Sequence, residues 1–232
     1  MIVLEAVDLT KVYEGGDGRT ITVLDGTHLQ VSRGEMVAVV GSSGAGKSTL
    51  LHLLGALDKP TRGTITIAGK SLAGRSDDDL SALRNHSVGF VFQFHHLLRE
   101  FTAAENVMMP LRIAGWDDKR AKTRAEELLT RVGLAGRMDH KPAALSGGEQ
   151  QRTAVARALA VDPAILLADE PSGNLDHANS ERLHDLFVEL SRDLEIAMVI
   201  ATHNRALAAR ADRTLLLEDG RLTDIDVREV VP

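Results

Sequence analysis

The residues best suited to chemistry in this chain form one short stretch, Gly41, Ser42, Ser43, Gly44, Ala45, Gly46, Lys47 and Ser48. The stretch matches the phosphate-binding pattern G-x-x-x-x-G-K-[ST]. Its glycines allow backbone N–H groups to fold around a di- or triphosphate without Cβ clashes. A helix starting at Lys47 would add partial positive charge, and Lys47 would reach the terminal phosphates. The Ser48 hydroxyl would be a ligand for Mg²⁺.

A loop of this kind needs a strand before it and a helix after it, and the sequence supplies both. The apolar run Met36–Val40 predicts a buried strand. Residues 50–57, directly behind Thr49, are apolar with helical spacing. A glycine-rich turn without a ligand is the alternative, but the strand, loop and helix in this order favour a phosphate-binding loop.

A pair of carboxylates follows a second apolar run. Residues 164–168 are typical of a parallel strand buried on both faces, and Asp169 and Glu170 close the run. We expect Asp169 to complete the Mg²⁺ site. Glu170 would orient or deprotonate a water molecule that attacks the γ-phosphate. The alternative interpretation is a solvated acidic turn.

A second glycine-containing stretch runs from Leu145 to Arg152 and includes Ser146, Gly147, Gly148 and Glu149. Ser146 and Glu149 fit a capping box, so the stretch could simply start a helix over residues 153–160. Each of the two glycines lowers helix propensity by about 1 kcal/mol. That cost makes sense if the backbone must closely approach an anion at the positive end of the helix.

The other predicted elements come from hydrophobic periodicity and turn residues. The first 31 residues indicate antiparallel strands, and most of residues 94–157 are helical in pattern. Strands are predicted over residues 2–9 (continued by 11–13), 20–24, 27–31, 64–68, 88–93 and 196–201, with a hairpin over 214–217 and 222–225; helices are predicted over 97–114, 117–132, 177–193 and 204–210.

Composition limits the class of protein. The 232 residues are 44% hydrophobic and 26% charged, as in an ordinary globular protein. The chain has no run of 18 apolar residues and no basic-then-apolar start, so we expect it to remain in the cytoplasm. Without cysteine it forms no disulfide and no zinc–thiolate site. A net charge of -6 argues against binding to a nucleic-acid backbone.

Taken in order, these motifs resemble those of the ATP-binding cassette (ABC) ATPases over essentially the whole chain. The resemblance rests on the loop Gly41 to Ser48, the signature at residues 145–149, the strand end at 164–170 and the segment 172–176. It implies an α/β fold with a P-loop NTPase (RecA-like) core, an antiparallel β subdomain and a helical subdomain. Residues 1–232 would form one ABC ATPase domain, with residues 1–93 and 158–232 in the core and 94–157 in the helical subdomain.

The resemblance also implies roles for single residues, with ATP as substrate and Mg²⁺ as cofactor. Tyr13 would stack on adenine, Gln93 would contact Mg²⁺ or the attacking water, and His203 would sense the γ-phosphate. Taken alone, Tyr13 could be a packed strand aromatic, Gln93 a polar group at a strand end, and His203 a turn residue before a helix. The implied catalytic residues are Glu170, His203 and Gln93; the nucleotide-binding residues are Tyr13, Gly41, Ser42, Ser43, Gly44, Ala45, Gly46, Lys47, Ser48, Thr49, Ser146, Gly147, Gly148 and Glu149; the metal ligands are Ser48, Gln93 and Asp169.

Two positions depart from common versions of the family pattern. Ser172 stands where Thr is frequent, and Asn204 follows His203 where Asp is frequent. Asn204 can still cap a helix, so neither change argues against ATPase activity.

The family mechanism implies a head-to-tail homodimer that forms with ATP. Each ATP would lie between the loop Gly41 to Ser48 of one chain and the signature Ser146 to Glu149 of the other. Hydrolysis would open the dimer and move whatever is bound to the helical region.

The segment from Phe94 to Leu111 resembles that of cassettes that power lipoprotein release. The resemblance implies that a homodimer docks through this segment onto two related inner-membrane permease subunits. It would lie peripherally on the cytoplasmic face and would not touch the lipoprotein itself. His95 and His96 are adjacent and lack a third ligand at suitable spacing, so we expect a docking surface there rather than a zinc site.

Two other functions remain open from the sequence. One is a cassette of the related cell-division or macrolide-export groups, which share the core motifs and differ in residues 94–111. The other is a cassette without a membrane partner, in DNA repair or translation. Against the second stand the acidic balance, the single cassette and the absence of a long heptad-bearing insertion.

Overall fold

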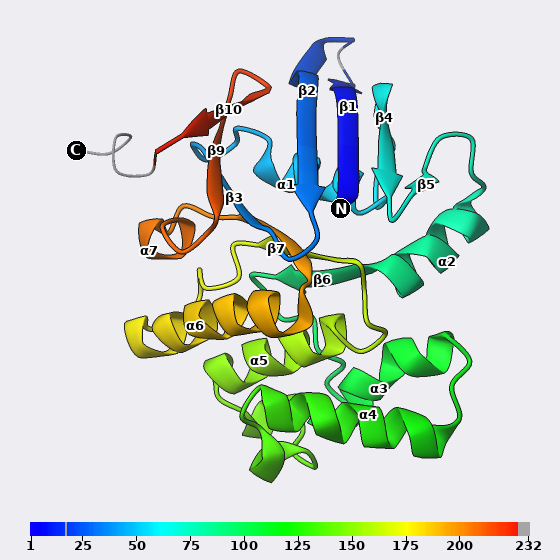
Figure 1. The fold of residues 1–232 in the computed structure, drawn as a ribbon, viewed down its shortest axis with the longest axis vertical. Coiled ribbons are helices and arrows are strands. Elements are labelled where there is room, and N and C mark those ends of the chain that lie inside the picture. Colours follow the sequence, from blue (N-terminus) through cyan, green and yellow to red (C-terminus); the bar gives the residue numbers. More distant parts are fainter. Residues whose placement is uncertain (17, 227–232) are drawn as a thin grey trace.

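The computed structural model describes residues 1–16 and 18–226 of the chain. Figure 1 shows two sheets above a group of helices. One sheet has four strands in the order β2-β1-β4-β5, and the other has six in the order β10-β9-β3-β8-β7-β6.

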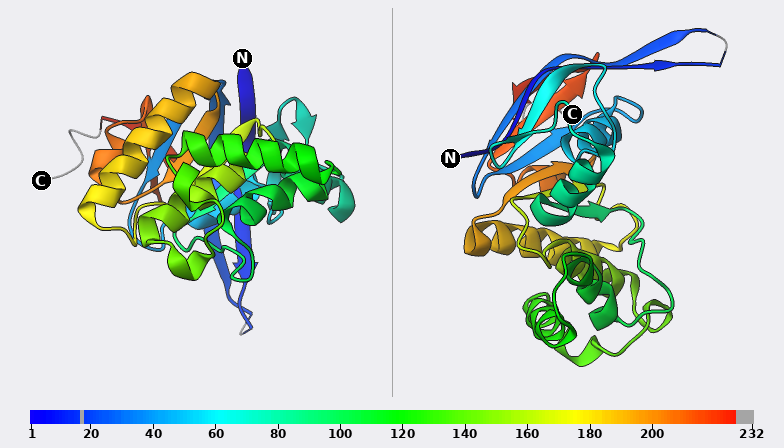
Figure 2. Two further views of the ribbon diagram at one scale, coloured as in Figure 1. Left: turned by 90° about the horizontal axis from the view of Figure 1, so that it is seen from below. Right: turned by 90° about the vertical axis from the view of Figure 1, so that its right-hand side faces the viewer.

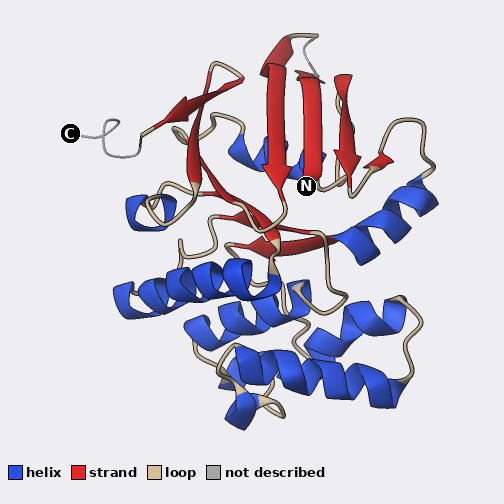
Figure 3. Cartoon of the chain, in the orientation of Figure 1, coloured by secondary structure: helices blue, strands red, loops and turns tan. Residues whose placement is uncertain are grey.

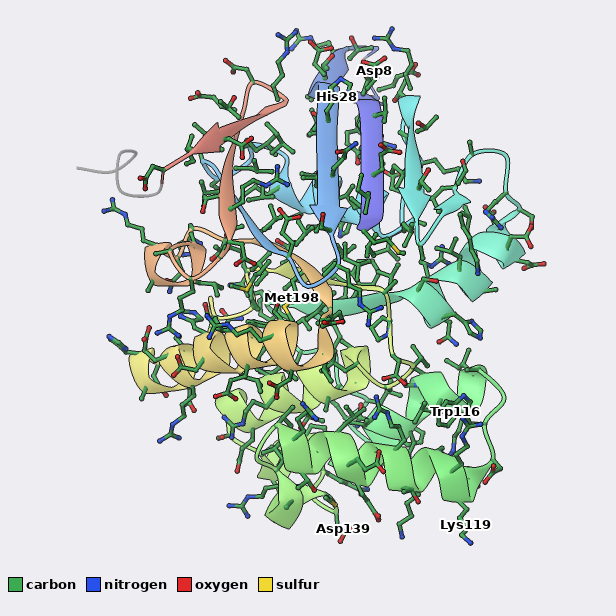
Figure 4. The ribbon with its side chains drawn as sticks, in the orientation of Figure 1. Asp8, His28, Trp116, Lys119, Asp139 and Met198 are labelled. Carbon is green, nitrogen blue, oxygen red and sulfur yellow. The ribbon has the colours of Figure 1, made fainter. Side chains whose placement is uncertain are left out.

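The four-stranded sheet is antiparallel and contains the long strands β1 (Ile2–Glu14) and β2 (Thr20–Ser32), the shorter β4 (Arg62–Ile67) and the short β5 (Lys70–Ser71). The sequence predicted two strands in place of β2. Gly26, with φ of 65°, is instead accommodated as an irregularity in the pairing between β1 and β2. Asp8 and His28 lie at a similar irregularity, where the Asp8 N–H donates to His28 Nδ1 at 3.4 Å (Figure 4).

The six-stranded sheet carries a parallel core made of β3 (Met36–Val40), β6 (Val88–Phe92), β7 (Ile165–Asp169) and β8 (Ala197–Ala201). Strand β9 (Arg213–Glu218) runs parallel to β3, and β10 (Arg221–Ile225) closes the predicted hairpin. Side chains of β8 alternate between two apolar clusters: Met198 and Ile200 face one, and Val199 faces the other. The sheet is therefore buried on both faces, as its continuous apolar runs predict.

Helices cover both faces of this sheet (Figures 1, 2 and 3). The cluster that contains Met198 also contains buried residues of α3, α4, α5 and α6, whereas the opposite cluster contains those of α1 and the antiparallel sheet. Figure 4 places Met198 between the sheet and the helical region, and Trp116 and Lys119 at the far side of that region. The helices are α1 (Lys47–Leu54), α2 (Asp77–Ser87), α3 (Ala103–Ile113), α4 (Asp118–Arg131), α5 (Gly147–Ala158), α6 (His177–Leu194) and α7 (Arg205–Ala208), with 3-10 turns at Ala135–Arg137 and Pro142–Ala144.

The helices differ from the predictions in three places. Helix α2 was not predicted, α5 covers Gly147–Ala158 rather than residues 153–160, and α3 begins at Ala103 rather than at residue 97. Thr102 and Glu105 form a reciprocal capping box there, in which each side chain accepts from the other residue's backbone N–H. The preceding apolar residues consequently lie in a loop.

The predicted fold class is confirmed by the parallel core, the antiparallel sheet and the helical region. The division at residues 93/94 and 157/158 stays a prediction. Within the described part of the chain, no helix is both long enough and apolar enough to cross a membrane.

Candidate functional site

The parallel strands bring most of the predicted site residues to one edge of the sheet. Asp169 pairs in register with Ala201 on one side and with Phe92 on the other, and Ala201 pairs with Val39. Residues that come after these strand ends therefore lie at the same edge: Gly41 directly after β3, Gln93 directly after β6, Glu170 directly after β7 and His203 two positions after the end of β8. This edge is where α/β sheets bind ligands.

The predicted phosphate-binding loop has the backbone that its glycines allow. Gly44 and Gly46 have φ of 80° and 103°. A Cβ on Gly46 would lie 2.7 Å from Val23 Cγ1, and one on Gly41 would lie 2.6 Å from the Leu217 carbonyl oxygen. Both positions therefore require glycine. The loop packs closely against Val23 of the antiparallel sheet and Leu217 of β9.

Helix α1 begins at Lys47, within the last two residues of the loop motif, and leaves backbone donors available there. Gly46 is its N-cap and provides no side-chain cap, and the first intrahelical bond runs from Leu50 N to Gly46 O at 2.8 Å. The N–H groups of the first turn, at Lys47 to Thr49, precede that bond and lack intrahelical acceptors. Lys47 Nζ donates to the carbonyls of Gly41 at 2.9 Å and Ser42 at 3.1 Å, so the ammonium group lies across the loop. The arrangement fits an anion with several oxygens.

Glu170 is placed at the centre of the strand-end group. It continues the pairing of β7 and β8, because its N–H donates to the Ala201 carbonyl at 2.9 Å, and its φ of 45° turns the chain away from the sheet. Its Oε2 accepts from the His203 N–H at 3.2 Å and lies 2.9 Å from His203 Nδ1. The Glu170 side chain is 18% exposed and His203 is 72% exposed, so the carboxylate is shielded while the imidazole faces solvent.

Gln93 is oriented by a residue that sequence reasoning did not single out. Its Nε2 donates to Asn174 Oδ1 at 3.0 Å, and Asn174 Nδ2 donates to the Gln93 carbonyl at 3.3 Å. These bonds leave Gln93 Oε1 as the side-chain acceptor for a cation or water. The signal for Asn174 was present, since it lies in the family segment 172–176.

The donor set suits Mg²⁺ only together with oxygens from a ligand. Ser48, Asp169 and Gln93 would offer hydroxyl, carboxylate and amide oxygens, which are ligands for a hard cation. Among the described residues, no group of three or more His, Cys, Asp or Glu side chains could hold a metal ion. Phosphate oxygens and water would have to complete the coordination, as is usual for Mg²⁺.

The signature residues start helix α5 on the helical side of the sheet. Ser146 Oγ accepts from the Glu149 N–H at 3.3 Å, and Glu149 Oε2 accepts from the Ser146 N–H at 2.8 Å. The bond from the Ser146 backbone is the main cause that lowers the pKa of Glu149 to about 2, and Arg137 at 2.9 Å contributes. A Cβ on Gly148 would lie 2.4 Å from Asn179 Oδ1, so this glycine permits close packing against α6.

Signature and phosphate loop are separate in this chain. Within residues 1–16 and 18–226, no hydrogen bond or ion pair connects Ser146–Glu149 to Gly41–Ser48. The structure thus brings the loop and Asp169, Glu170, Gln93 and His203 together, but not the signature.

Tyr13 lies on β1 and is 40% exposed. Its hydroxyl donates to Asp58 Oδ2 at 3.0 Å, and Lys11 Nζ lies 4.8 Å from the centre of its ring. Asp58 also pairs with Lys11 at 2.8 Å. The Tyr13 ring is thus fixed by its hydroxyl, while part of the ring surface stays exposed to solvent.

The segment after Gln93 is fastened to both ends of α5. His95 Nε2 donates to the Gly147 carbonyl at 2.9 Å at the start of the helix. Near its end, Arg157 donates to the carbonyls of His95 and His96, each at 2.8 Å. Burial lowers the pKa of the Arg157 guanidinium. Sequence reasoning missed Arg157, because nothing near it in the chain indicates its partners.

A buried amide fixes the same segment from α3. Asn106 is fully buried, and its Oδ1 accepts from the Leu98 N–H at 2.8 Å. Its Nδ2 shares two N–H groups among the carbonyls of Leu98, Phe101 and Thr102, which lie at 2.9 to 3.2 Å. The loop between β6 and α3 is therefore ordered by side-chain bonds rather than by helix.

Comparisons with known proteins agree with this geometry. Residues 24–173 match the family model described as ABC transporter. The chain is 54% identical over 219 residues to the lipoprotein-releasing system ATP-binding protein LolD of Geobacter metallireducens, covering 94% of this chain and 97% of that protein. LolD of Bordetella pertussis is also 54% identical over 219 residues, with 94% of each chain covered.

Solved structures give the same picture. A dimeric bacterial ABC transporter cassette superposes with a TM-score of 0.88 and 37% identity over 97% of this chain and 99% of that chain. A dimeric post-hydrolysis state of the same cassette, bound to ADP and Pi, has a TM-score of 0.87 with the same identity and coverage.

Proposed function

This chain belongs to the ABC transporter family and is an ATPase, and on that premise we propose that it is the ATP-hydrolysing subunit of a lipoprotein-releasing complex. The observation that carries the substrate assignment is the identity of 54% with LolD proteins over 94% of this chain. The meeting of the phosphate loop with Glu170 and His203 at one edge of the sheet supports the chemistry.

The phosphate groups of ATP bind to the loop Gly41 to Ser48. The free N–H groups at the start of α1 donate to phosphate oxygens, and Lys47 exchanges its carbonyl partners for the β- and γ-phosphates. Tyr13 stacks on the adenine through the open part of its ring. Binding requires no change in the glycine backbone, which already has the left-handed conformations of the loop.

Ser48, Asp169 and Gln93 would hold Mg²⁺, which would neutralise negative charge on the phosphates. Asn174 fixes the Gln93 amide so that its oxygen faces the ligand. Glu170 holds the attacking water and accepts its proton, while His203 fixes the carboxylate through two contacts to one oxygen. Ser146, Gly147, Gly148 and Glu149 do not reach this site within the chain.

A second copy of the chain supplies the missing signature. In a head-to-tail homodimer, the start of α5 in one protomer faces the γ-phosphate bound to the loop of the other. Ser146 and the N-terminal N–H groups of α5 then donate to the anion. The dimeric state of the superposed cassettes supports this arrangement.

A groove beside the segment from Phe94 to Leu111 supports docking to a membrane partner. The groove has a volume of about 360 Å³ and includes Leu98, Pro110, Ile113 and Arg157 in its lining. Phe94 is 65% exposed and Ile113 is 68% exposed. Two inner-membrane permease subunits bind here with cytoplasmic segments that carry apolar side chains, so the homodimer lies peripherally on the cytoplasmic face of the membrane. Nucleic acid and the lipoprotein itself are not bound by this chain.

The segment at the groove connects docking to the signature. His95 bonds to Gly147, and Arg157 bonds to both His95 and His96, so a shift of the segment moves α5. ATP-driven dimerisation and partner binding therefore act on the same helix.

Isolation of the complex tests this proposal. Tagged Glu170→Gln protein is incubated with Mg-ATP and detergent-solubilised membranes of the source cell, and the captured proteins are identified by mass spectrometry. We expect a pair of permease subunits of a lipoprotein-releasing system. Lys47→Ala protein is the matched control and should capture fewer. Capture of a cell-division or efflux permease would overturn the lipoprotein assignment, and capture of none by a variant that binds ATP would overturn the membrane role.

A further inference from the structure

A histidine is buried in the middle of α6, behind the site. His184 has no exposed surface, and its Nε2 lies 3.0 Å from Ser172 Oγ. Its Nδ1 is buried without a hydrogen-bond partner and lies 3.5 Å from Glu181 Oε1. Neither the phosphate loop nor the signature uses this group.

The surroundings of His184 fix its tautomer. Nδ1 faces a carboxylate, which can only accept, so the proton of the neutral ring belongs on Nδ1. Nε2 is then an acceptor, and the Ser172 hydroxyl donates to it. Arg210 holds the carboxylates on this side, with Nη2 2.5 Å from Glu181 Oε2 and Nη1 2.7 Å from Asp185 Oδ1.

Ser172 belongs to the turn that carries Glu170. The Gly173 N–H donates to the Glu170 carbonyl at 3.0 Å, and the Leu175 N–H donates to the Ser172 carbonyl at 3.1 Å. Glu170 has a φ of 45°, a conformation that is uncommon outside glycine and has to be held by its surroundings. Ser172 is only 5% exposed, and its hydroxyl is the side-chain group that connects this turn to α6.

We propose that His184 is a positioning residue for ATP hydrolysis, which accepts a hydrogen bond from Ser172 and thereby fixes the turn that places the Glu170 carboxylate. The inference rests on the role of Glu170 proposed above. The contacts from Ser172 to His184 and from His184 to Glu181 are similar to those of a nucleophilic triad. However, a serine that is 5% exposed beside a fully buried histidine cannot receive a substrate. The hydrogen bond therefore acts by fixing the position of the Glu170 carboxylate, since a small displacement of a catalytic group lowers the reaction rate.

The protonation state of His184 should make the rate of ATP hydrolysis depend on pH in a way that tests this role. Burial lowers the pKa of His184 and Arg210 lowers it further, against the opposing effect of Glu181 and Asp185. The ring is neutral at pH 7 and accepts from Ser172. At acidic pH the ring gains a proton on Nε2 and can no longer accept the hydrogen bond from Ser172, so the turn that carries Glu170 is no longer held by this bond.

The test measures steady-state ATP hydrolysis by the purified full chain. His184→Leu removes the acceptor, and we expect kcat to fall about tenfold, within the range known for misplaced catalytic groups, with KM for ATP changed less than about twofold. His184→Gln places an amide oxygen near the position of Nε2 and should restore kcat to within about threefold of the wild type. The fall in rate at acidic pH that His184 causes should be absent from this variant.

Leu190→Ala is the matched control, because Leu190 is buried on the same helix away from Ser172. It should lower the unfolding midpoint without lowering kcat. An equal kcat in His184→Leu and the wild type, or a loss that His184→Gln does not reverse, would overturn the inference. If His184→Leu does not fold, Ser172→Ala replaces it: kcat should fall to a similar extent, and adding His184→Gln should cause no further loss.

Glu170→Gln separates the two levels of the proposal. If it hydrolyses ATP at the normal rate, the role of Glu170 fails and the inference about His184 fails with it. If it is inactive while His184→Leu is fully active, the function stands and only the positioning role of His184 is wrong.

Discussion

Glu170 and His203 contact each other twice through one carboxylate oxygen. Glu170 Oε2 accepts the His203 N–H at 3.2 Å and lies 2.9 Å from His203 Nδ1. These two contacts hold together residues that follow the neighbouring strands β7 and β8. The carboxylate is preorganised, which favours hydrolysis because no reorganisation is needed during the reaction.

Glu170→Gln should separate ATP binding from hydrolysis. The amide oxygen can still accept from His203, so the site keeps its shape, but it cannot take a proton from water. We expect kcat to fall by about 10²- to 10⁴-fold while ATP affinity stays within about threefold. Single-turnover hydrolysis and binding of a fluorescent ATP analogue measure the two quantities. A normal rate would show that another group activates the water.

Lys47→Ala should abolish ATP binding, and hydrolysis with it, because the loop loses its only side-chain cation between Gly41 and Ser48. Lys59→Ala is a suitable control, since Lys59 is 66% exposed and pairs with Asp77 on the surface. Equilibrium binding of a fluorescent ATP analogue should detect the loss. If the Lys47 variant binds ATP as tightly as the control, Lys47 does not belong to the phosphate site.

Arg157→Lys should weaken communication between the membrane partner and the ATPase. A lysine ammonium cannot reproduce the fork that holds the carbonyls of His95 and His96. We expect the ratio of partner-stimulated to basal hydrolysis to fall roughly 2- to 30-fold, the range of coupling changes of single substitutions. The assay uses the reconstituted complex.

Arg112→Lys, on α3, is the control for this experiment, because Arg112 pairs with the exposed Asp118. An unchanged ratio in Arg157→Lys would show that the two bonds to the segment do not transmit partner binding.

Glu149 should make stability depend on pH below neutrality. Its pKa is about 2 in the folded chain against an ordinary value of 4.5, so the folded state favours the carboxylate. The resulting stabilisation is complete above about pH 4.5 and is lost as the pH falls toward 2. Glu149→Gln retains an acceptor for Ser146 but not the charge that pairs with Arg137, and should be less stable by about 1 kcal/mol at pH 7.

Urea unfolding of both proteins at pH 7 and pH 3 checks this expectation. The difference between the two proteins should shrink at pH 3. A difference that is equal at both pH values would mean that the Glu149 charge does not contribute.

Much of the parallel core and the phosphate loop could be predicted from the sequence, because their signals are local. Met36–Val40 is apolar throughout, and the loop that follows it has every fixed residue of its pattern. Helix α2 has a weaker signal. Only Leu80, Leu83 and Ser87 are buried on it, and three aspartates fill its first turn. The Ser76 N-cap was the sign that could have revealed it.

Relations between distant residues could not be predicted. Gln93 and Asn174 are 81 positions apart, and His95 and Gly147 are 52 apart. Residues 97–101 keep an apolar spacing that suits a helix, yet Asn106 binds their backbone from the next element. Only packing of the whole chain creates these contacts, so the sequence indicated which residues matter but not how they are held.

The bonds that Asn106 makes have a consequence for recognition. A loop of this length would ordinarily have to become ordered when a partner binds, and that loss of conformational freedom weakens association. Here one fully buried amide already contacts four backbone groups of the segment, namely one N–H and three carbonyls. For the docking proposed above, the segment from Phe94 to Thr102 is therefore ordered in advance, and little of the binding free energy would be spent on ordering it.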